Sequence, residues 1–72
     1  MEFTKERTAG NLKAIRNLRN YSQQQLADRS GVSRDSINGY ENAENVMSLE
    51  AAVKLATALD CSVDSLVLEI QV

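Results

Sequence analysis

Residues 22 to 42, Ser-Gln-Gln-Gln-Leu-Ala-Asp-Arg-Ser-Gly-Val-Ser-Arg-Asp-Ser-Ile-Asn-Gly-Tyr-Glu-Asn, decide the fold of this chain. Ser22 is suited to cap a helix, because its hydroxyl can accept a hydrogen bond from an unpaired amide of the first turn. Gln25 follows at the spacing of a capping box. Ser33 can cap a second helix in the same way, and Gly31 can adopt the positive φ that ends the first helix. The stretch therefore predicts two short helices joined by a tight turn.

This pattern is that of a helix-turn-helix, in which the second helix enters the major groove of DNA. We expect the first helix at about 23–29 and the second at about 34–42. Ile37 and Tyr40 of the second helix, three residues apart, are expected to face the protein. Its outward face is short and polar, which suits contacts to base edges and phosphates. That face carries Arg34, Asp35, Asn38, Gly39 and Asn42.

A set of residues that begins in this stretch continues through most of the chain: Ser22-Gln23, Leu26-Ala27, Gly31-Val32-Ser33, Ile37, Tyr40-Glu41-Asn42, Ser48-Leu49-Glu50, Leu55-Ala56, Ala58-Leu59 and Ser62-Val63-Asp64-Ser65-Leu66. This set resembles the Cro and lambda-repressor-like superfamily, or Xre family, of bacterial and phage regulators over roughly residues 9 to 68. The resemblance implies an all-α, five-helix DNA-binding domain with the helix-turn-helix at helices two and three. It also implies an ion pair between Arg16 and Glu41 that fixes the orientation of the recognition helix.

The composition agrees with one small domain and excludes several classes of protein. The 72 residues are 43% hydrophobic, enough for one core, and proline is absent, so helices can run without breaks. The aromatic content of 4% argues against a stacking platform for single strands. With no His and a single Cys, neither a zinc site nor a Ser/His/Asp triad is available, and no cofactor is expected.

The single cysteine, Cys61, cannot form an intramolecular disulfide, which fits a reducing cytoplasm. A buried small hydrophobe is the favoured interpretation of this residue. No signal peptide and no long apolar run is present, so neither export nor a membrane span is expected.

The charge is distributed unevenly. The formal net charge is −2, but residues 1 to 36 hold seven bases and four acids, a balance of +3, whereas residues 37 to 72 hold one base and six acids, a balance of −5. One face can therefore meet phosphate while the other stays acidic, provided that the bases share a face.

Outside the central stretch, we expect a loose start over residues 1 to 8, with either Thr4 or Thr8 as the first cap. Ser48 is expected to cap a fourth, central helix that Asp60 ends, and Ser62 a short fifth one. The buried stripe of the first helix is expected to be Leu12, Ile15 and Leu18. The apolar set of the fourth is Leu49, Ala52, Val53, Leu55, Ala56 and Leu59.

The tail departs from this helical pattern. From Leu68 to Val72 apolar and polar residues alternate, as in a strand. A strand here needs a partner, so residues 67–72 either pair with the same tail of a second subunit or form a frayed or locally packed end.

Four residues on the outward face of the recognition helix are candidate readers of DNA. Arg34 can bond bidentately to guanine, although it can also be a solvated surface arginine. Asp35 can accept from the cytosine amino group or simply favour the helix N-terminus. Asn38 can read adenine or bond a phosphate. Gly39 either lets the backbone approach DNA or is a tolerated surface glycine.

Four further residues are candidates for the phosphate backbone. The resemblance implies that Gln23 bonds a phosphate and braces the recognition helix, and that Asn42 meets a phosphate. Neutral donors of this kind position a protein on the duplex. Ser33 is mainly a cap whose amide is a candidate phosphate contact, and Ser36 is a further candidate contact.

One departure from the family bears on affinity. The family has a glycine and then a basic residue where this chain has Ala43 and Glu44, so a glycine turn and a basic phosphate contact are lost.

Two hypotheses follow. The first is a sequence-specific, double-stranded DNA-binding regulator, a repressor that binds a palindromic operator as a homodimer. The second is a protein-interaction module on the same fold, such as the antitoxin of a toxin–antitoxin pair, which the acidic half favours. No residue cluster supports an enzyme.

Overall fold

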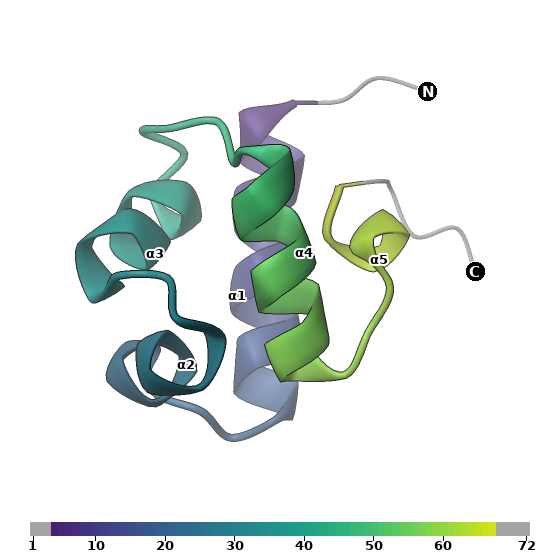
Figure 1. Ribbon diagram of the computed structural model, residues 1–72. Helices are drawn as coiled ribbons and strands as arrows, with labels where there is room; N and C mark the ends of the chain where they lie inside the picture. The colour runs from purple at the N-terminus through teal and green to yellow at the C-terminus, as the bar shows by residue number, and fades with distance from the viewer. Residues whose placement is uncertain (1–3, 68–72) are drawn as a thin grey trace.

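The computed structural model describes residues 4–67, and these form five α-helices (Figure 1). The predicted all-α, five-helix architecture is therefore confirmed. The order along the chain is α1 (Lys5–Leu18), α2 (Gln23–Ser30), α3 (Arg34–Glu41), α4 (Leu49–Leu59) and α5 (Val63–Val67).

The first helix begins earlier than expected. Thr4 is the cap, since its hydroxyl accepts a hydrogen bond from the Arg7 amide at 3.1 Å. Thr8 is a buried residue inside the helix, and its hydroxyl donates back to the Thr4 carbonyl at 3.2 Å. The prediction of a loose start over residues 1 to 8 was thus wrong for residues 5 to 8, because one good cap begins α1 at Lys5.

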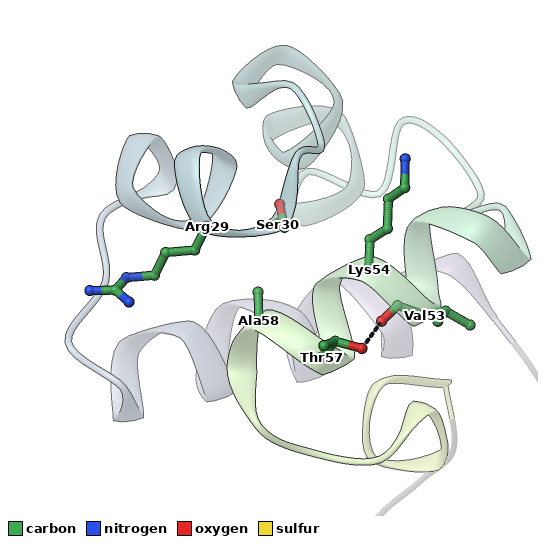
Figure 2. A pocket seen from close by; sticks show the side chains of 6 residues that line it. All are labelled: Arg29, Ser30, Val53, Lys54, Thr57 and Ala58. Carbon is green, nitrogen blue, oxygen red and sulfur yellow. Dashed lines mark hydrogen bonds between the residues drawn. The ribbon is translucent and has the colours of Figure 1, made fainter.

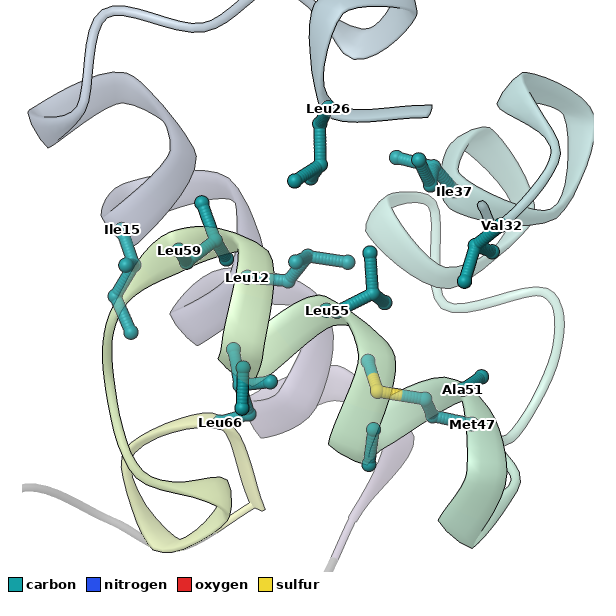
Figure 3. Packing of buried hydrophobic residues seen from close by; sticks show 12 residues of the cluster. Leu12, Ile15, Leu26, Val32, Ile37, Met47, Ala51, Leu55, Leu59 and Leu66 are labelled. Carbon is teal, nitrogen blue, oxygen red and sulfur yellow. The ribbon is translucent and has the colours of Figure 1, made fainter. Parts of the chain in front are cut away.

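The core lies between α1 and α4, and α2, α3 and α5 close it (Figure 3). Every element therefore contributes to one core rather than to local pairs. Six large side chains of this core are fully buried: Leu12, Leu26, Ile37, Leu55, Leu59 and Leu66.

Some apolar residues of α1 and α4 are exposed. Leu18 is 76% exposed, so its predicted burial was wrong, and two members of the apolar set of α4, Leu49 and Val53, are 77% and 47% exposed. Steps of three residues drift around a helix by about 60° each, because one turn takes 3.6 residues. From Leu12, two such steps carry the stripe off the buried face. The half-buried Arg16, one turn after Leu12, occupies the inner face instead.

Three helices end with a non-glycine residue in the left-handed region. Asn20, Ala43 and Asp60 have φ of 61°, 58° and 54° and follow α1, α3 and α4. After α3, the Ala43 amide donates to the Tyr40 carbonyl at 3.2 Å and the Glu44 amide to the Gly39 carbonyl at 2.9 Å. This pair of bonds is a Schellman motif, whose αL position is usually glycine.

A predicted strand-like tail, residues 67–72, lies outside the described residues except for Val67, which ends α5. Within residues 4–67, no helix is long and apolar enough to cross a membrane.

Candidate nucleic-acid interface

The turn between α2 and α3 has the local structure that its residues predict. Ser22 accepts from the Gln25 amide at 3.0 Å and the Gln25 side chain accepts from the Ser22 amide at 2.8 Å, which completes the capping box. Gly31 ends α2 with φ of 79° and its amide donates to the Ala27 carbonyl at 2.9 Å. Ser33 then caps α3. Caps and glycine together set the start and direction of the second helix.

The outer face of α3 is polar and exposed. Arg34, Asp35 and Asn38 are exposed, and they lie on α3 away from Ile37, which is fully buried. Tyr40 is half-buried and packs against the core. The predicted inward and outward faces are thus confirmed for these residues. The helix presents a guanidinium, a carboxylate and an amide to solvent on one short surface.

A buried ion pair holds α3 against α1. Arg16 Nε lies 2.6 Å from Glu41 Oε2, and Arg16 Nη2 donates to Glu41 Oε1 at 2.9 Å. The Arg16 side chain is 12% exposed and that of Glu41 is 3% exposed. Arg16 Nη1 also donates to the Tyr21 carbonyl at 2.8 Å, so one guanidinium joins three segments. The hydrogen bond to Glu41 raises the pKa of Arg16 above its usual value, and burial opposes that rise. The ion pair implied by the family resemblance is therefore present.

Gln23 connects this ion pair to the exposed face. Its side-chain amide donates to Glu41 Oε1 at 3.3 Å and lies 3.4 Å from Asn38 Oδ1. Because the Asn38 oxygen receives this donor, the Asn38 NH₂ group is directed to other acceptors. A continuous set of polar contacts thus runs from Arg16 in α1 to Asn38 on the recognition helix.

Gly39 is not on the outer face. It is buried, and a Cβ built at this position lies 2.5 Å from Asn45 Nδ2. The expectation that Gly39 lies exposed on the outward face was therefore wrong, because the loop after α3 folds back over this residue. The Schellman bond from Glu44 to the Gly39 carbonyl draws the loop there. The signal in the sequence is the position of Gly39 five residues before Glu44, which is the separation of the outer hydrogen bond of a Schellman motif. The helical periodicity alone does not show this contact.

The remaining candidates for phosphate contacts surround this face. The Ser33 hydroxyl accepts from the Ser36 amide at 3.1 Å and donates to the Ser36 hydroxyl at 2.9 Å, which leaves the Ser36 proton for another acceptor. Asn42 is exposed just after α3, and its amide lies 3.4 Å from Glu44 Oε1. A carboxylate thus stands beside a candidate phosphate donor.

The basic residues of the first half do not all serve one face. Arg16 is engaged by Glu41, and Arg19 donates to the Leu59 and Asp60 carbonyls at 2.8 and 3.2 Å, which braces the end of α4. Arg29 lies 4.7 Å from the centre of the Tyr21 ring. Sequence reasoning did not find the brace by Arg19, because it depends on the approach of two distant helix ends. Much of the positive balance of residues 1 to 36 is thus used within the protein.

One groove of the described chain lies beside α4. A groove of about 430 Å³ lies between α2 and α4 and is lined by Arg29, Ser30, Val53, Lys54, Thr57 and Ala58 (Figure 2). Its lining has no nucleophile and base in contact. Residues 4–67 hold no group of three His, Cys, Asp or Glu that could bind a metal ion.

The five-helix fold and the geometry of α2, its turn and α3 define a helix-turn-helix DNA-binding domain. Comparisons with known proteins agree with this assignment. Residues 12–66 match the helix-turn-helix family HTH_3. The chain is 44% identical over 62 residues to the cryptic phage CTXphi transcriptional repressor RstR of Vibrio cholerae, covering 86% of this chain and 52% of RstR. It is 42% identical to the control protein C.SmaI of Serratia marcescens, covering 86% of this chain and 74% of C.SmaI. The chain therefore spans about half the length of one of these relatives.

Two solved structures have a fold similar to that of this chain. The restriction-modification controller protein C.AhdI from Aeromonas hydrophila superposes with a TM-score of 0.82 at 34% identity, over 86% of this chain and 94% of that one. An HTH_3 family transcriptional regulator from Vibrio cholerae gives 0.83 at 27% identity, over 86% of this chain and 35% of that one. The chain belongs to the HTH_3 family of helix-turn-helix, DNA-binding transcriptional regulators, a family whose members are not enzymes.

Proposed function

We propose that this protein is a transcriptional repressor that binds a palindromic operator as a homodimer in the cytoplasm. The single observation that carries the proposal is the exposed face of α3, where Arg34, Asp35 and Asn38 stand on a helix fixed by a buried ion pair. The similarity to the repressor RstR supports repression. One recognition helix reads only a few base pairs, so two half-sites about 34 Å apart supply the specificity.

Direct readout is assigned to the start of α3. Arg34 is its first residue, and its guanidinium reads guanine O6 and N7. Asp35 accepts from a cytosine amino group. Asn38 presents its NH₂ group, because its oxygen is directed to Gln23, so it prefers an acceptor such as guanine O6, thymine O4 or a phosphate oxygen.

Phosphate anchoring is assigned to neutral donors around this helix. They are Gln23, Ser33 through its amide, Ser36 and Asn42, and such contacts fix the register without reading sequence. Glu44 opposes them, since it adds a negative charge beside Asn42. Affinity from phosphate contacts is therefore modest, and specific binding depends on the base readers and on two half-sites.

Selection of binding sites from random duplex DNA tests this proposal. The expected result is an enriched inverted repeat, with half-sites separated by one helical turn. Arg34→Ala lowers the affinity for the selected site by roughly 5- to 150-fold, which corresponds to about 1–3 kcal/mol. Enrichment of no sequence, or of a site that Arg34→Ala binds as tightly, refutes the proposal.

The charge of the second half favours a different candidate. Residues 37 to 72 carry a net −5, and Glu44 lies beside the proposed interface. A module that binds a basic partner protein, as an antitoxin binds its toxin, uses this acidic half rather than α3. Such a protein selects no operator, whereas its Glu44→Lys variant loses the partner.

A further inference from the structure

The outer face of α4 exposes large apolar side chains. Leu49 is 77% and Val53 is 47% exposed on α4, and Val46 in the loop just before it is 61% exposed. Within residues 4–67 the other large apolar side chain with such exposure is Leu18, at the distant end of α1. Apolar side chains that gather on one helix face, rather than singly, mark an interaction surface.

This face is divided into an apolar flank and a charged flank. At about 100° per residue, Leu49 and Val53 stand about 40° apart on one flank of α4. Glu50 and Lys54 stand about 40° apart on the other flank, and their side chains form an ion pair at 3.0 Å. Thr57 lies between the flanks.

We propose that a second copy of this chain docks on this face, with α4 packed antiparallel to α4 of the partner around a two-fold axis near residues 51 and 52. The proposal rests on the proposed homodimeric function and specifies its interface. The two-fold places like flank against like flank. Leu49 then faces the partner's Val53, and Glu50 faces the partner's Lys54. A single register satisfies both pairs, and both occur twice, as an isologous interface requires.

Other arrangements of the same helices lack this match. A parallel two-fold places the apolar flank against the partner's charged flank, which buries Glu50 or Lys54 against Leu49 without a partner. Unpaired charges of this kind are costly in an interface. The self-complementary charge pattern therefore selects a second copy, antiparallel, as the occupant.

An interface on this face extends beyond Val46, Leu49 and Val53. A stable dimer buries about 800 Å² per partner, more than three side chains supply. The groove between α2 and α4 adjoins this face, because its lining includes Val53 of the apolar flank and Lys54 of the charged flank (Figure 2). The partner's Glu50 and Lys54 side chains lie toward this groove in the proposed register.

Sedimentation of the DNA-free protein over micromolar concentrations tests the surface. The wild type dimerises, and Leu49→Glu raises the dimer dissociation constant about tenfold or more, since the substitution enters the interface twice. Leu18→Glu is the matched control, because Leu18 is equally exposed but lies near the end of α4 opposite to Leu49, where Arg19 meets Leu59, and it leaves dimerisation unchanged. Circular dichroism verifies that both variants keep the wild-type helical content. A monomeric wild type, or equal effects of the two variants, overturns the proposal.

A charge exchange tests the register. Glu50→Lys and Lys54→Glu each weaken self-association, whereas a mixture of the two variants forms a heterodimer with both cross-pairs restored. If the mixture of the two variants associates no more strongly than either variant alone, the antiparallel arrangement is overturned. DNA binding is measured separately: a dimer without DNA binding contradicts the proposed function alone, and operator binding with dimerisation insensitive to Leu49→Glu contradicts the surface alone.

Discussion

The end of the recognition helix contains a defined source of strain at Ala43. The residue adopts φ of 58° at the αL position of a Schellman motif. An L-residue in this conformation costs about 1–2 kcal/mol, because its Cβ approaches the following carbonyl. Ala43→Gly removes that cost and adds about 0.4–1 kcal/mol of unfolded-state entropy. The net expectation is a gain of about 1 kcal/mol in the free energy of unfolding.

The same chemical change elsewhere is expected to have the opposite sign. Ala14 lies exposed in the interior of α1, where Ala→Gly costs about 1 kcal/mol of helix stability. Ala14→Gly is therefore the matched control for Ala43→Gly. The two variants differ by about 2 kcal/mol in stability although they lose the same methyl group.

Thermal and urea unfolding, followed by circular dichroism, measure this difference. For a domain of this size, 1 kcal/mol corresponds to a shift in Tm of about 4–8 °C, upward for Ala43→Gly and downward for Ala14→Gly. A lowered Tm for Ala43→Gly refutes the reasoning, because it means that the loop does not hold residue 43 in the left-handed region.

Three further predictions concern charges and the thiol. Glu41→Gln leaves the Arg16 guanidinium buried without its counter-ion and lowers the free energy of unfolding by about 3 kcal/mol in urea titrations, and an unchanged midpoint contradicts the role of the pair. Glu44→Lys tightens binding to any duplex and steepens the slope of log K against log salt concentration by about 0.9, because it removes an acid beside Asn42 and supplies a phosphate contact. An unaltered slope places this loop away from DNA. Burial raises the pKa of the Cys61 thiol, so folded protein reacts with iodoacetamide more slowly than urea-unfolded protein at the same pH, and equal rates show an open thiol.

Residues that cap helices and form turns allowed the helix-turn-helix to be predicted from the sequence. Caps and a glycine at positive φ act within a few residues of one another, so Ser22 and Gly31 determine where α2 begins and ends, and Ser33 determines where α3 begins. The ion pair between Arg16 and Glu41 was available only from the family resemblance, because 25 residues separate its members.

Features that depend on approach between distant segments were not predictable. The brace from Arg19 to the end of α4 arises from tertiary packing between residues 40 apart in the sequence. The loop over Gly39 is local, but helix periodicity alone does not show it. Leu18 was assigned to the buried stripe by its three-residue spacing, which drifts off the buried face, and hydrophobicity alone did not show that Leu49 is exposed. The exposed apolar side chains of α4 were thus visible in the sequence, but their partner was not.

The most direct measurement is a fluorescence anisotropy titration of labelled duplex from upstream of the protein's own gene, at two salt concentrations, with scrambled duplex as competitor. Wild type, Arg34→Ala and Arg29→Ala are compared, since both arginines are exposed but only Arg34 lies on α3. We predict specific, salt-weakened binding that Arg34→Ala lowers roughly 5- to 150-fold and Arg29→Ala leaves nearly unchanged. Equal losses in the two variants contradict base reading by the first residue of α3. If scrambled DNA competes as well as the upstream duplex, the titration is repeated with the sequence selected from random duplexes. Absence of specific binding to that selected sequence contradicts sequence-specific recognition.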